Sequence, residues 1–273
     1  MLGAVRPRLP QKTSHLFALL GFAALLSACA ANTGGGYNPT TPRNTLDPEA
    51  LASSDMKTLV ITSVNLGSPS RKYLQKEEAR VDARVADALQ NAGYKIMPSR
   101  EFSQRWNNAI LTYGNPIDPT TGRVNTNSFI QIMQTVKQQM LEQTNVDGFV
   151  FTDLLEKDVV FTSGMTRVAR WDGVTRKPSL EGPGQGVTAE FDWARPAAAA
   201  TIRIAIFNRD LVKVFDGAGG MDMTDAVDTR SGLDFVRRRD ILENENFIDE
   251  GIAIALHPFI PMENWPGNNP DEK

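Results

Sequence analysis

Reactive side chains are scarce in this chain of 273 residues. Cys29 is the only cysteine, which excludes a disulfide within the chain. Histidine occurs twice, at His15 and His257. No nucleophile elbow, zinc-protease motif or phosphate-binding loop is found in the sequence. A Ser-His-Asp triad needs histidine, and a zinc site usually needs several histidines or cysteines, which are scarce here. We therefore expect that the protein is not an enzyme and has no metal site and no cofactor.

An apolar run long enough to cross a membrane is also missing. The mostly apolar stretch near the start extends from Leu16 to Leu26, about 11 residues, whereas a membrane-spanning helix needs roughly 20. Arg6, Arg8 and Lys12 precede it. A basic start followed by a short apolar segment is typical of a secretory signal and not of a membrane anchor.

The residues at the end of this stretch predict how the signal is processed. They are Leu26, Ser27, Ala28 and Cys29. This order resembles the lipobox of bacterial lipoproteins, which implies that residues 1–28 are cleaved off and that Cys29 carries a covalent lipid. Alanines follow the cysteine, where inner-membrane lipoproteins of enteric bacteria carry aspartate, so the resemblance implies anchoring in the outer membrane, facing the periplasm. The alternative is a secreted protein whose signal contains a cysteine by chance.

The charge of the processed chain bears on its partners. Removal of residues 1–28 takes away three basic residues and no acidic one, and leaves 26 basic and 32 acidic residues, a net charge of −6. Nucleic-acid binding needs a basic surface, so we expect no nucleic-acid partner. The hydrophobic content of 41% is ordinary for a globular protein.

Composition divides the processed chain into three parts. Residues 29–56 are rich in glycine, proline, asparagine and threonine, which predicts a lipidated flexible tether with a reach of roughly 30 Å. Residues 57–261 carry the periodic apolar patterns of a single α/β periplasmic domain. Residues 262–273 are predicted to form a polar tail.

The periodicity predicts an alternating order of elements in the domain. Strands are expected near 58–64, 94–97 and 146–155, and helices near 72–91, 99–110, 126–143 and 245–256. Residues 159–215 predict an antiparallel meander, interrupted by a long loop at 177–196, and the glycines at 217–220 predict a bulge. This order predicts an α/β (α+β) fold, a three-layer domain with a mixed, partly antiparallel sheet flanked by helices.

Three stretches carry a resemblance to a known superfamily. They are the helix that runs into a Gly-Tyr strand at 80–96, the strand at 146–150, and the strand at 212–217 with the late helix at 253–256. They resemble the periplasmic lipoproteins that include the curli secretion channel, the exopolysaccharide-export ring lipoprotein and the outer-membrane activator of penicillin-binding proteins. The insertions at 115–125 and 177–196 depart from that pattern, and no lipid-facing hairpin is evident, which argues against a channel.

The resemblance and the scarcity of reactive groups favour a non-enzymatic envelope scaffold or regulator that binds a partner protein. A ring-forming accessory of an exporter, and hence a homo-oligomer, is the alternative. An envelope hydrolase using Asp153 and Glu156 ranks last. Tryptophan and arginine are common at binding hot spots, and the candidate partner-binding residues near the long loop and in the basic triplet are Arg167, Arg170, Trp171, Trp193, Arg237, Arg238 and Arg239.

Overall fold

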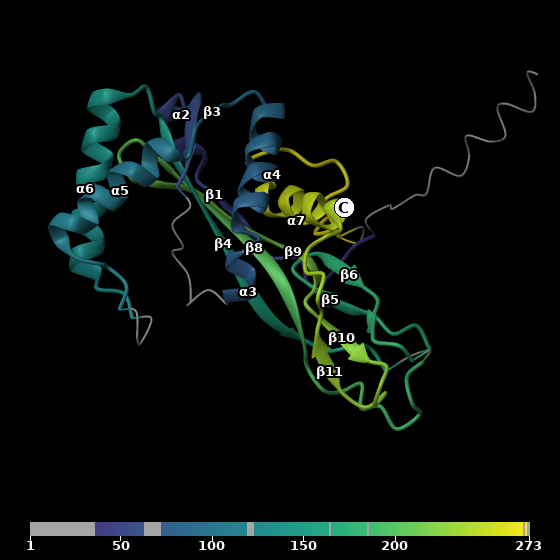
Figure 1. Ribbon diagram of the computed structural model, residues 1–273. Helices are drawn as coiled ribbons and strands as arrows, with labels where there is room; N and C mark the ends of the chain where they lie inside the picture. Colours follow the sequence, from purple (N-terminus) through teal and green to yellow (C-terminus); the bar gives the residue numbers. More distant parts are fainter. Residues whose placement is uncertain are drawn as a thin grey trace, which may run out of the picture. The chain divides into compact units, whose positions relative to one another are not determined.

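The computed structural model (Figure 1) describes residues 36–62, 72–118, 123–163, 165–184, 186–269 and 271. The predicted signal, the lipobox residues Leu26, Ser27 and Ala28, and the lipid-bearing Cys29 lie outside the described residues. The chain divides into two units, Met1–Gly35 and Gly36–Lys273, and the described residues all belong to the second. None of the helices in this described part is long and apolar enough to span a membrane.

A six-stranded mixed sheet forms the centre of the second unit. Its strand order is β1-β9-β8-β4-β2-β3. β2 lies parallel to β3 and β4, and the other pairs are antiparallel. The bounds are β1 Thr45–Leu46, β2 Thr58–Ile61, β3 Lys95–Met97, β4 Gly148–Val159, β8 Ala197–Asn208 and β9 Lys213–Met223.

Helices cover both faces of the sheet and make three layers. They are α2 Pro48–Ser54, α3 Lys72–Gln75, α4 Glu78–Asn91, α5 Arg100–Tyr113, α6 Thr126–Gln143 and α7 Glu245–Leu256. Ile202, Ile204 and Ile206 alternate along β8 and pack in one core with α4 and α7. On the opposite face, Phe149 and Phe151 of β4 pack with α5 and α6. The predicted three-layer fold with a mixed sheet is confirmed.

Glycine allows α7 to lie directly on β9. A Cβ atom on Gly219 would overlap the carbonyl oxygen of Gly251, and one on Gly217 would overlap that of Ala255. The register of β8 and β9 shifts between Ala199 and Thr201, where β9 holds one extra residue after Gly220. The predicted bulge at 217–220 is wrong, because these residues pair with β8 in regular register and the bulge follows Gly220. The glycines serve the contact with the helix instead.

Beyond the far ends of β4 and β8 lies a second group of short strands, here named the β lobe (Figure 1). Its strands are β5 Ala169–Trp171, β6 Val174–Arg176, β7 Leu180–Glu181, β10 Asp225–Asp228 and β11 Phe235–Arg237. β5 pairs with β6, and β7 and β11 flank β10. The predicted antiparallel meander over 159–215 is confirmed for β8 and β9, which pair antiparallel. It is wrong for the part before the long loop, because β4 continues to Val159 and pairs directly with β8, while β5 pairs with β6.

The predicted flexible tether is wrong for residues 36–56. β1 pairs with β9, and Asp47 caps α2 by accepting a hydrogen bond from the Ala50 amide at 2.9 Å. The amide group of Asn44 donates to the carbonyls of Ile254 and His257 at 2.8 and 2.6 Å. Polar side chains hold this segment to the domain through hydrogen bonds with distant backbone, which an apolar pattern cannot reveal.

The predicted polar tail is wrong for residues up to about Pro266. Pro266 is buried, and its carbonyl accepts a hydrogen bond from the Asn38 amide at 2.7 Å. The indole of Trp265 stacks on the ring of His257 at a centroid distance of 4.7 Å. His257 Nδ1 also accepts a hydrogen bond from the Met262 amide at 3.1 Å. The start and the end of the described chain thus meet on the domain.

Candidate functional site

Three loops meet at the end of the β lobe, and we name this region the tip. The first is the connection between β4 and β5, where the Thr162 amide donates a hydrogen bond to the Val168 carbonyl at 2.9 Å. The others are the loop 188–195 and the turn 229–234. The Thr188 hydroxyl donates to the Gly232 carbonyl at 2.9 Å, and Arg195 forms an ion pair with Asp234. Exposed loops held together in this way commonly carry function.

Arg167 and Trp193 occupy the centre of the tip. The guanidinium of Arg167 lies 5.0 Å from the centroid of the Trp193 ring, a cation–π arrangement. The indole packs against Phe161 at 5.7 Å and Phe191 at 4.6 Å. Both Arg167 and Trp193 are partly exposed. The structure thus brings together two of the residues that the sequence singled out, on a rigid aromatic base.

Four large apolar side chains in this part of the chain are exposed. Met165 in the first loop is fully exposed, and Leu233 in the turn is 45% exposed. Val160 at the end of β4 and Leu180 on β7 are each 52% exposed. Sequence reasoning missed all four, because a single apolar residue in a loop or at a short strand gives no signal of its exposure.

The prediction that Trp171 contributes to a binding surface is wrong. Its side chain is 5% exposed, and its indole nitrogen donates to the Ala200 carbonyl at 3.3 Å. Side chains alternate along β5, so Ala169 and Trp171 point into the lobe while Arg170 points to solvent. Arg170 is exposed as predicted.

The basic triplet is not one docking surface. Arg237 Nη2 lies 2.9 Å from the Glu156 carboxylate, and its Nε lies 3.3 Å from that of Asp225. Arg238 donates to Asp222 at 2.7 Å and to the Met223 carbonyl at 2.8 Å. Arg239 is the most exposed of the three, at 74% side-chain exposure. Two of the three predicted partner-binding arginines therefore join β11 to β4, β9 and β10 through ion pairs.

The carboxylates considered for hydrolysis lie in different environments. Asp153 and Glu156 are three residues apart on β4 and therefore point to opposite faces of the sheet. Glu156 accepts hydrogen bonds from Arg237 and Tyr73, and burial, followed by the Glu156 contact, raises the pKa of Tyr73 to about 12. Asp153 is 4% exposed and lies across from Arg203. These two acids do not face each other across a common cleft, as a glycosidase pair would.

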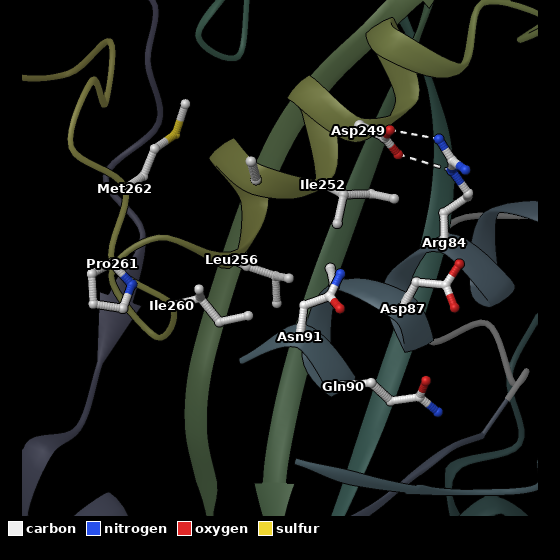
Figure 2. Close-up of a pocket in the computed structure, with 12 residues that line it drawn as sticks. Arg84, Asp87, Gln90, Asn91, Asp249, Ile252, Leu256, Ile260, Pro261 and Met262 are labelled. Carbon is white, nitrogen blue, oxygen red and sulfur yellow. Dashed lines mark hydrogen bonds and ion pairs between the residues drawn. The ribbon is translucent and has the colours of Figure 1, made fainter. Parts of the chain in front are cut away.

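The described residues also include a groove between α4 and α7 (Figure 2). Its volume is about 460 Å³, within the usual range for ligand sites. Within the described ranges, no three side chains of histidine, cysteine, aspartate or glutamate lie close enough together to hold a metal ion. The lining of the groove offers carboxylates, amides and apolar side chains to a ligand.

Comparison with known proteins assigns no family to the chain. No family model matches it, and neither a curated protein nor a solved structure does. The resemblance to periplasmic lipoproteins therefore stays a prediction from the sequence. The tip and the groove provide the structural basis for a functional assignment.

Proposed function

We propose that this protein is an outer-membrane lipoprotein that acts as a non-enzymatic scaffold or regulator and binds a partner protein of the cell envelope through its tip. The observation that carries the proposal is the Arg167–Trp193 pair, set among the exposed side chains of Met165 and Leu233. Tryptophan, arginine and methionine are enriched at protein interfaces. Their grouping on three adjoining loops favours a binding surface over a chance exposure of single residues.

The tip is preorganised for binding. Trp193 is held by Phe161 and Phe191, and Arg167 Nη1 donates to the Thr162 carbonyl at 3.0 Å. Side chains that are already ordered lose less entropy when a partner binds, which raises the affinity gained from each contact. The lobe thus presents restrained anchors rather than freely moving ones.

The proposed lipid on Cys29 places the domain near a membrane. Cys29 precedes Gly36, where the described domain begins, by seven positions in the sequence. Fully extended, such a segment spans at most about 25 Å. The connection between Cys29 and the domain is therefore shorter than the predicted tether of residues 29–56, because residues 36–56 belong to the domain. A partner would therefore be met close to the membrane surface.

Site-specific photo-crosslinking in cells tests the proposal. A photoreactive amino acid replaces Met165 or Leu233 in the full-length, membrane-anchored protein. Leu111 on α5, 85% exposed, provides a matched control because it is apolar and exposed but lies away from the tip. We expect one adduct of the same mass from both tip positions and none from position 111. Absence of an adduct at the tip, or equal adducts at all three positions, would reject the tip as the binding surface.

A further inference from the structure

The groove between α4 and α7 has two chemically different sides. Its accessible apolar lining comes from Ala88 of α4, Ala253 of α7 and the segment Ile260 to Met262, which lie over the buried side chains of Ile252 and Leu256 (Figure 2). Polar side chains of α4 line the opposite side, among them Asp87, Gln90 and Asn91. A site of this kind recognises a ligand that is itself partly apolar and partly polar.

The charge along the groove is negative. Arg84 is the one basic side chain that lines it among the described residues, and it is already paired: its Nε lies 2.9 Å and its Nη2 2.5 Å from the two carboxylate oxygens of Asp249. Glu245 lies 3.5 Å from the same guanidinium. Asp87 is exposed and has no hydrogen-bond or ion-pair partner in the described part of the chain. Two carboxylates thus share one guanidinium, and the exposed carboxylate of Asp87 adds a further negative charge that remains for a ligand.

The length of the groove limits what can occupy it. Arg84 and Asn91 mark two turns of α4, and α7 contributes two turns from Asp249 to Leu256. Two helical turns measure roughly 11 Å, the length of about three extended residues. One side of the groove is apolar and the other is acidic, so an acidic or fully polar ligand would be disfavoured there.

We propose that this groove binds a short basic segment of a partner protein, with branched apolar side chains against Ala253 and Ile260 and a lysine or arginine beside Asp87. Charge complementarity indicates which kind of segment binds here. The apolar lining contacts the apolar side chains of the segment, and the carboxylate of Asp87 favours a cationic side chain next to them. The groove is built on α4 and α7 and the tip on loops of the β lobe, so the two sites are independent. A negative result at the tip would therefore not contradict the proposal for the groove, and a negative result at the groove would not contradict the proposal for the tip.

Fluorescence anisotropy with defined peptides tests this proposal on the full chain in non-ionic detergent. The probes are fluorescein-labelled Lys-Leu-Leu-Lys and its acidic counterpart Glu-Leu-Leu-Glu. The variant Asp87→Lys reverses the charge in the groove. Glu142→Lys is the matched control, because Glu142 is exposed on α6 and the change in net charge is the same.

We expect saturable binding of the basic peptide and none of the acidic one. Asp87→Lys should weaken that binding by about tenfold, and Glu142→Lys should change it less than about twofold. Equal binding of both peptides, or an equal loss in both variants, would overturn the proposal. Saturable binding of labelled spermidine without saturable binding of the peptide would instead identify a small-amine site and would also overturn it.

Discussion

The contact between β9 and α7 and the tip of the β lobe are stabilised in opposite ways. At the first, glycines remove side chains, so that helix and strand backbones touch and large residues such as Ile204 and Ile252 fill the space around them. At the second, aromatic rings and ion pairs hold short strands, and apolar side chains remain in solvent. The comparison suggests that stability resides in the β9–α7 contact and that recognition resides in the lobe.

The largest effect is expected where the backbones touch. Gly219→Ala places a methyl group against the Gly251 carbonyl oxygen, and neither backbone can move without displacing the sheet or the helix. We expect a loss of at least about 3 kcal/mol in the free energy of unfolding, measured by urea denaturation. Gly186→Ala in the β lobe is the control, because a Cβ there meets no atom within 4 Å. Similar losses in both variants would contradict the comparison.

The ion pairs of the lobe should have smaller and graded effects. Arg238→Ala leaves the Asp222 carboxylate, with a side-chain exposure of 6%, without its cation. We expect a loss of about 2 kcal/mol in the free energy of unfolding. Arg239→Ala removes the neighbouring charge from an exposed pair 3.4 Å long and should cost less than about 0.5 kcal/mol. Equal losses would mean that the burial of Asp222 does not matter.

Recognition should be separable from stability at the tip. Trp193→Ala should reduce the photo-crosslinking yield from position 165 by about tenfold, because the central aromatic anchor is removed. The thermal midpoint should fall by only a few degrees, since Trp193 is partly exposed. Tyr113→Ala on α5 serves as the control for loss of an exposed aromatic ring. An undiminished yield in Trp193→Ala would show that the indole does not contribute to partner binding.

The smallest effect concerns a carboxylate at the start of α4. Burial, and then the nearby carboxylates of Asp82 and Asp153, raise the pKa of Glu78. The folded state therefore disfavours ionised Glu78 at neutral pH, and this cost disappears below the ordinary glutamate pKa, where both states are protonated. We expect Glu78→Gln to raise the thermal midpoint slightly at pH 7 and to leave it unchanged near pH 3. A gain of the same size at both values would contradict this cause.

Much of the fold could be predicted because its apolar pattern is long and regular. The helices expected at 126–143 and 245–256 match α6 and α7, and each begins after an asparagine cap, Asn125 and Asn244. The positions of the larger strands along the chain could also be predicted. Short strands such as β5 and β7 were not, because two or three residues show no period and their positions depend on partners far along the chain.

The candidate site was predictable only in part. Aromatic and basic residues near the long loop predicted Arg167 and Trp193, but the same reasoning predicted Trp171, which the β5–β6 turn carries into the core. The exposure of Met165 depends on how three loops meet. The groove depends on the spacing of two helices, α4 and α7, that lie far apart in the sequence. Such features arise from tertiary packing and leave no local pattern.

The hydrogen bond between Asn38 and Pro266 has a practical consequence for labelling this protein. Because it joins the two ends of the described domain, a fluorescent reporter fused after Lys273 would emerge beside the point where the chain enters the domain. With a lipid on Cys29, such a reporter would crowd the bilayer and leave the tip accessible. A dye attached at Met165 would instead report from the tip, so the two labels would distinguish membrane proximity from partner contact.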